Sequence, residues 1–176
     1  MFNYLKNKIG KEKSENEIRK DFKQLFFKNQ NHFWINEDKA TKRIIEILLN
    51  SLSVQHIDFF KKNPTFLIPC QAHLSCAIGR TQNHHLILVF PELVQLLKSA
   101  SGLHGAAILT HELGHIYHKH TELKIDTLTA QIEADQFAYQ LGFGEELQEV
   151  LLDHAYSIDC RVRIAKLTSQ LITQNK

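Results

Sequence analysis

The sequence predicts a mainly helical α+β domain with a small antiparallel sheet. Apolar residues recur at helical spacing in the first third and the last third of the chain. Short β-rich runs, separated by proline, glycine and polar residues, occupy the middle. A further helical stretch follows them and contains two histidines four residues apart. The 176 residues suffice for one domain with its own core.

Capping residues and apolar residues at helical spacing predict the first helices. Ser14 and Glu17 form a capping-box pattern, which predicts a helix over about 14–28. A second helix is expected over about 38–50, and a short apolar stretch over 54–60 comes next. We predict that residues 1–60 form an N-terminal helical segment, acting as a lid or regulatory part.

In the middle of the chain the helical spacing of apolar residues gives way to short runs typical of strands. The runs 66–69, 73–78 and 86–90 are short and apolar or β-rich, and we expect them to pair as the antiparallel sheet. A helix should start at Pro91 and end near residue 98. The stretch 103–120 then carries apolar residues at helical spacing.

The last third is helical. Asp126 or Thr127 can cap a helix that ends before Gly142. Two further helices are expected over about 145–153 and 159–173. We predict that residues 61–176 form the functional domain.

The helix over 103–120 contains the sequence His-Glu-Leu-Gly-His. His111 and His115 are four residues apart, so both imidazoles can face one metal ion. Glu112 lies beside them, where a carboxylate can deprotonate a metal-activated water. This is the H-E-x-x-H pattern of zinc hydrolases, whose metal takes three protein ligands and leaves one position for water. The competing interpretation is a helix with two surface histidines and an incidental glutamate.

The third metal ligand must come from another part of the chain, and the segment 130–138 offers the candidates. Glu133 is a natural oxygen ligand, and Asp135 could instead bond the outer nitrogen of a ligand histidine. These two residues point about 200° apart on a helix, whereas Gln131 and Asp135 share a face. The best ligand type and the best geometry therefore do not coincide.

These segments resemble the gluzincin metallopeptidases of family M48, the group that includes the HtpX type. His111 to Ile116, with His120 five residues after His115, is similar to that family's H-E-L-G-H-I and its following histidine. Residues 133–138 resemble its E-A-D-x-x-A segment, and 157–162 its late H-P-S-x-x-x-R-I segment. The resemblance implies a zincin-like fold with an H-E-x-x-H active-site helix, one Zn²⁺ ion and peptidase activity. The ImmA/IrrE peptidases are the nearest rival.

The resemblance also implies site residues. Arg161 would reach toward the active site, and Tyr156 or His154 would donate to the oxyanion. In these families the ligand glutamate stands four residues before the Asp of E-A-D, where this chain has Gln131. We take Glu133 as the third ligand, with Gln131 as the alternative.

The predicted function is a zinc-dependent endopeptidase with Glu112 as general base, His111, His115 and Glu133 as ligands, and Asp135 behind them. An edge strand beside the metal helix could pair with an extended substrate, which makes Leu86, Leu88 and Phe90 the expected cleft wall. The alternatives are a catalytically weak or inactive zincin-fold regulatory or binding protein, and a repressor-cleaving peptidase of the ImmA/IrrE kind.

Composition narrows the partners. A net charge of +2 gives no indication of a nucleic-acid-binding surface. No apolar run is long enough for membrane insertion. Cys70, Cys76 and Cys160 have no metal-type spacing, which favours free thiols. We expect a cytoplasmic protein that acts on a peptide or protein substrate; the sequence leaves its oligomeric state open.

Overall fold

A computed structural model describes residues 13–71, 77–81 and 84–174. In these ranges the chain forms a mainly helical α+β fold, as predicted. The elements, in chain order, are α1 (Glu15–Lys28), a 3-10 turn (Gln30–His32), α2 (Phe33–Asn36), α3 (Lys39–Ser51), α4 (Val54–Lys62), β1 (Thr65–Pro69), β2 (Ala77–Thr81), β3 (His84–Val89), α5 (Pro91–Lys98), α6 (Gly102–Tyr117), α7 (Thr127–Gln140), α8 (Gly144–Leu152) and α9 (Ile158–Gln174).

The helix predictions are confirmed at most positions. Ser14 and Glu17 form the capping box of α1, and the carboxylates of Asp38 and Asp126 cap α3 and α7. The apolar stretch after residue 53 is itself a helix, α4. Residues 73–76 of the expected middle strand lie outside the described residues, as do residues 1–12 of the expected N-terminal segment and Cys76. Cys70 and Cys160 are free thiols.

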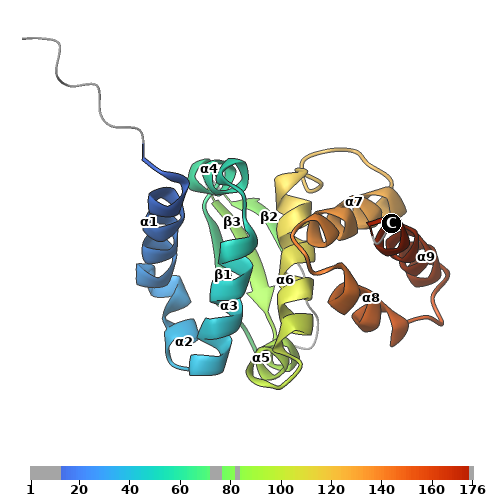
Figure 1. Cartoon of the computed structure of the whole chain (residues 1–176), viewed down its shortest axis with the longest axis horizontal. Helices are drawn as coiled ribbons and strands as arrows, with labels where there is room; N and C mark the ends of the chain where they lie inside the picture. The colour runs from blue at the N-terminus through green and yellow to red at the C-terminus, as the bar shows by residue number, and fades with distance from the viewer. Residues whose placement is uncertain (1–12, 72–76, 82–83, 175–176) are drawn as a thin grey trace, which may run out of the picture.

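The sheet is mixed, so the prediction of an antiparallel sheet is wrong in one of its two pairings. The strand order is β1-β3-β2 (Figure 1). β2 and β3 are antiparallel, whereas β1 runs parallel to β3 with Leu67 opposite Ile87. Apolar runs predict that strands exist, but their spacing does not reveal which strand lies in the centre. β3 lies between the other two strands and therefore pairs with both, in parallel with β1 and antiparallel with β2.

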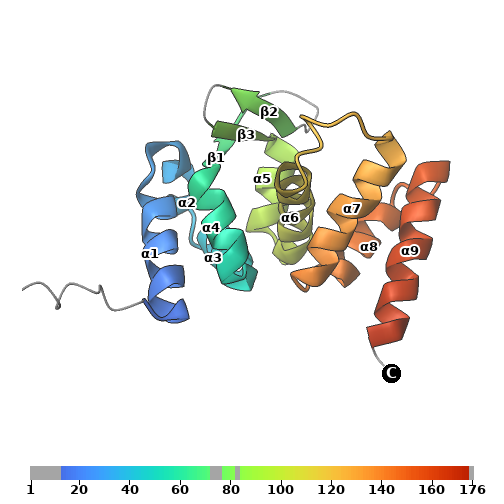
Figure 2. The same cartoon turned by 90° about the horizontal axis from the view of Figure 1, so that it is seen from above.

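The helices cover one face of this sheet, as Figure 2 shows from above. In Figure 1, α6 lies between the N-terminal helices α1, α3 and α4 and the C-terminal helices α7, α8 and α9. One hydrophobic cluster runs through both sides of α6, with Ile45 and Leu48 of α3, Leu109 and Leu113 of α6, and Phe137 of α7. The N-terminal helices thus share the core of the predicted functional domain, and their role as a lid stays a prediction. Within the described ranges, no helix combines the length and apolar composition that a bilayer span requires.

The outer edge of β1 is blocked by side chains from the 3-10 turn and from α2. The Leu67 N–H donates to Nε2 of His32 over 3.1 Å, and Nε1 of Trp34 donates to the Leu67 carbonyl over 3.1 Å. His32 Nδ1 lies 2.8 Å from the Phe26 carbonyl, to which it must donate. The buried imidazole is therefore neutral with its proton on Nδ1, and it links α1 to the sheet.

We predict that acid weakens this link. Burial lowers the pKa of His32, although the contact with the Phe26 carbonyl raises it. The unfolded chain therefore binds this proton more readily, so the stabilisation is complete above the ordinary pKa of 6.5 and is lost as the pH falls below it. Protonation also removes the acceptor for Leu67, a loss of about 1 kcal/mol.

Urea unfolding at about pH 7.5 and about pH 5.5 measures the effect. The wild type should lose more free energy of unfolding over this interval than His32→Gln, whose amide cannot be protonated. Equal losses in the two proteins would show that His32 does not contribute.

Candidate metal centre

Helices α6 and α7 approach closely at Gly114. A Cβ atom at Gly114 would lie 2.9 Å from Cα of Ala134 and 3.0 Å from its carbonyl oxygen. No side chain other than hydrogen fits there without moving backbone, which explains a glycine inside a helix despite its cost. The contact brings the side chains of α7 to the histidines of α6.

The two motif histidines converge. Nε2 of His111 and Nε2 of His115 lie 3.1 Å apart on the side of α6 that faces α7. Two ligands of one tetrahedral zinc ion lie about 3.3 Å apart, because each zinc–nitrogen bond is about 2.0–2.1 Å. The spacing of the two imidazoles therefore suits one shared zinc ion.

The outer nitrogens set the tautomers. Nδ1 of His111 lies 2.8 Å from Oδ1 of Asp135, although it is poorly aligned for a hydrogen bond. A carboxylate at this distance favours the proton on Nδ1, which leaves the lone pair of His111 on Nε2. Burial and the neighbouring His111, His120 and Arg163 lower the pKa of His115 to about 3, so this ring is neutral at pH 7.

A second carboxylate acts on His115 through His120. Nε2 of His120 lies 2.8 Å from Oε2 of Glu133, and its Nδ1 lies 2.8 Å from Nδ1 of His115. When Nε2 of His120 donates to Glu133, its Nδ1 can accept from Nδ1 of His115, and the lone pair of His115 then lies on Nε2. Lys119 makes this contact possible, because its positive φ of 59° turns the chain back toward α6 after the helix ends.

Gln131 is an α7 residue whose amide reaches the imidazole of His115. Its Nε2 lies 3.3 Å from Nε2 of His115, and rotation of the amide by 180° would present its oxygen instead. Among the residues that the structure describes, no three His, Cys, Asp or Glu side chains gather as a metal site. In this arrangement the carboxylate of Glu133 contacts His120, and its role as the third ligand stays a prediction. The donors that fit zinc are two strong imidazoles and one weak neutral amide.

Glu112 lies next to this group. Its side chain is half-buried, and burial raises the pKa of the carboxyl, while His111 and Arg163 lower it. A raised pKa suits a carboxylate that must take up a proton and give it back.

Arg163, rather than Arg161, reaches the site from α9. Its guanidinium makes two hydrogen bonds of 2.7 Å to the carboxylate of Asp135. Burial raises the pKa of Asp135, but the bonds with Arg163 and the contact with His111 bring it below the ordinary value. Arg161 is exposed. The helical phase of α9 separates the two arginines, and the expectation that Arg161 reaches toward the active site stays a prediction.

The other expected residues make no hydrogen bond with His111 or His115 among the residues that the structure describes. Tyr156 is 83% exposed, and its hydroxyl contacts His154 at 3.4 Å. β3 is the central strand, so its backbone is already paired and the expectation of an edge strand there is wrong. Leu86 and Leu88 are half-buried and Phe90 is buried; their role as a cleft wall stays a prediction.

The sequence model of peptidase family M48 matches residues 75–149. The matched stretch contains all of α6 and α7, and so His111, Glu112, His115 and Gln131. The match supports a relationship to an M48 metallopeptidase family. No curated protein and no solved structure matches this chain.

We predict that Arg163→Gln destabilises the protein by roughly 3–5 kcal/mol, because it leaves the buried Asp135 carboxylate without its cation. Arg161→Gln on the same helix is the matched control and should change the free energy of unfolding by less than about 0.5 kcal/mol. Urea unfolding of both variants at neutral pH makes the comparison. If both variants lose a similar free energy of unfolding, the ion pair between Arg163 and Asp135 does not contribute to stability.

Proposed function

We propose that this protein is a zinc-dependent peptidase that hydrolyses peptide bonds in an extended segment of its substrate. The observation that carries the proposal is the convergence of two Nε2 atoms 3.1 Å apart. The tautomers deduced above aim both lone pairs at the same point, where they repel each other unless a cation lies between them. The M48 match to the same residues supports the same conclusion.

His111, His115 and Gln131 would hold the ion, and a bound zinc ion would polarise the scissile carbonyl and acidify a water molecule. Asp135 and Glu133 would keep the two imidazoles in the tautomer that binds metal, the first directly and the second through His120. Glu112 would accept the proton of the attacking water and pass it to the leaving amine. Arg163 would keep Asp135 ionised.

The sheet offers one place for an extended substrate. β1 is blocked by His32 and Trp34, and β3 is paired on both sides. Within the described ranges, the outer edge of β2 has no strand partner, and β2 contacts α6. A substrate strand would add to this edge through its backbone, which gives affinity without much dependence on sequence.

Gln131 supports a second candidate, a zincin-fold regulatory or binding protein with a weak or inactive site. A neutral amide binds zinc less strongly than the carboxylate expected at this position. A repressor-cleaving peptidase of the ImmA/IrrE kind would use the same residues and is a narrower form of the first proposal.

The first experiment removes the proposed general base. With zinc and a pool of fluorogenic peptides, Glu112→Gln should lower kcat/KM by roughly 10²–10⁴-fold, because the amide cannot accept a proton. Glu122→Gln, an exposed change in the loop after α6, should leave the rate unchanged, and a chelator should abolish it. Full activity in Glu112→Gln would eliminate the mechanism.

The second experiment changes the weak ligand. Gln131→Glu should raise zinc affinity by roughly tenfold or more, since a carboxylate replaces an amide beside the two imidazoles. Gln140→Glu adds the same charge at the exposed end of α7 and should not change it. Competition with a chromophoric chelator measures both. A wild type that takes up no zinc at micromolar concentration would favour the regulatory protein, and unchanged affinity in Gln131→Glu would show that residue 131 is not a ligand.

A further inference from the structure

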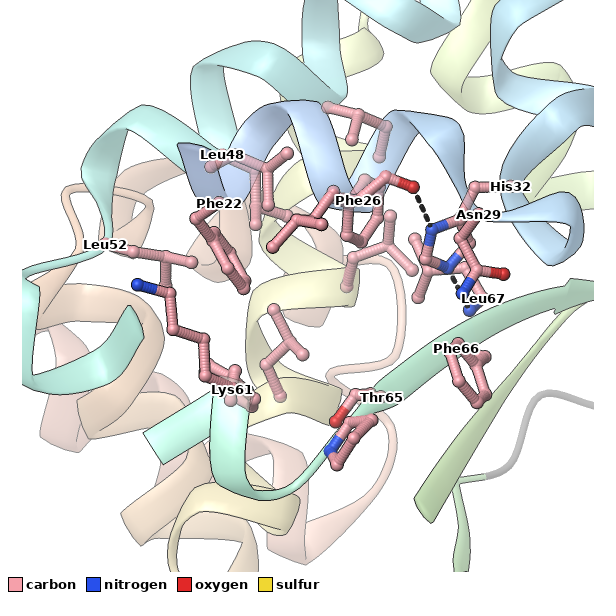
Figure 3. Close-up of a pocket in the computed structure, with 17 residues that line it drawn as sticks. Phe22, Phe26, Asn29, His32, Leu48, Leu52, Lys61, Thr65, Phe66 and Leu67 are labelled. Atoms are coloured by element: carbon pink, nitrogen blue, oxygen red, sulfur yellow. Dashed lines mark hydrogen bonds between the residues drawn. The ribbon is translucent and has the colours of Figure 1, made fainter. Parts of the chain in front are cut away.

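An apolar pocket lies on the other side of α6 from the metal centre. It has a volume of about 210 Å³ and is lined from α1, α3, α4, β1 and α6. Leu109 and Leu113 of α6 form part of its wall. Figure 3 shows Phe22 and Phe26 of α1 on one side of the space and Thr65 and Phe66 of β1 on the other.

The pocket suits a hydrocarbon chain rather than water. A buried water needs two to four polar partners, and most of the lining side chains are apolar. His32 has both ring nitrogens engaged, with the Phe26 carbonyl and the Leu67 N–H. Well-packed proteins contain few spaces of this size, and an apolar cavity of about 150 Å³ accepts benzene. By proportion, this pocket accepts about eight heavy atoms of a ligand.

One end of the pocket is cationic. Lys61 is exposed at the mouth, and Figure 3 shows its amino group near Leu52. Arg19 donates hydrogen bonds to the carbonyls of Asn50 and Leu52 at this end. Asp21 is an acidic residue close enough to interact with Lys61. Its carboxylate already forms a salt bridge with Lys13, with 2.6 Å between Nζ and Oδ2. In the described part of the chain, Lys61 has no hydrogen bond or salt bridge of its own.

We propose that this pocket binds a single-chain carboxylate of medium length, with its carboxylate at Lys61 and its hydrocarbon tail between α1 and β1, against Leu109 and Leu113. The arrangement satisfies both ends of such a molecule, because the tail leaves water and the head meets a cation that has no salt bridge in the described residues. The site is separate from the metal centre and does not depend on peptidase activity.

The test uses sodium octanoate as the probe and the metal-free full chain as the target. Isothermal titration calorimetry should show saturable binding with a negative heat-capacity change, the mark of buried apolar surface. Octylamine, which has the same tail and the opposite charge, should bind at least about tenfold more weakly, and butanoate should bind weakly because its tail is short.

Two variants locate the site. Lys61→Glu should weaken octanoate binding at least about tenfold, whereas Lys62→Glu, an exposed neighbour outside the lining, should not. Leu25→Trp adds bulk at a lining position that is 64% exposed, so it should fill the mouth and weaken binding without burying a misfit in the core.

No saturable octanoate binding at millimolar concentration would overturn the proposal. So would binding that is the same in the wild type, Lys61→Glu and Leu25→Trp. Binding of an apolar peptide without any binding of octanoate would show that the pocket recognises a different class of ligand and would also overturn it. Since the calorimetry measures binding in the absence of metal, none of these three results bears on the proposed peptidase activity.

Discussion

The approach of α6 to α7 at Gly114 is the constraint on which the rest of the site depends. Because residue 114 has no Cβ, Ala134 lies against the α6 backbone, and two residues close to it on α7, one a turn earlier and one next to it, are held near the histidines. Gln131 then meets His115, and Asp135 meets His111. A bulkier residue at 114 would separate the helices and would move every one of these contacts together.

The same constraint bears on a question that the sequence alone left open, which is the identity of the third metal ligand. Glu133 is the better ligand type, but it lies on a different side of α7 from Gln131 and Asp135. In the structure it meets His120, which the left-handed turn at Lys119 brings back toward α6. Glu133 therefore contacts His120, which in turn contacts His115. The amide of Gln131 contacts His115 directly. Residue chemistry favours Glu133 as the third ligand, whereas helix geometry places the amide of Gln131 next to His115.

Local signals predicted much of the fold. The capping box of α1, the aspartate caps of α3 and α7, and the histidine pair of α6 depend on residues within one helical turn of each other, so the sequence reveals them directly. The place of β3 in the centre of the sheet, and the choice of Arg163 over Arg161 as the partner of Asp135, depend on how distant segments pack. No periodicity in a single sequence contains that information, which is why both were missed.

The side chains that cover β1 have a consequence for how this sheet can grow. An unprotected sheet with two open edges can polymerise, since each new chain offers a fresh template to the next. Here His32 and Trp34 occupy the Leu67 N–H and carbonyl on one flank. The β1 flank therefore cannot accept a strand at Leu67, so the proposed capture of a substrate strand is confined to the β2 flank, and copies of this chain cannot stack through both edges of the sheet.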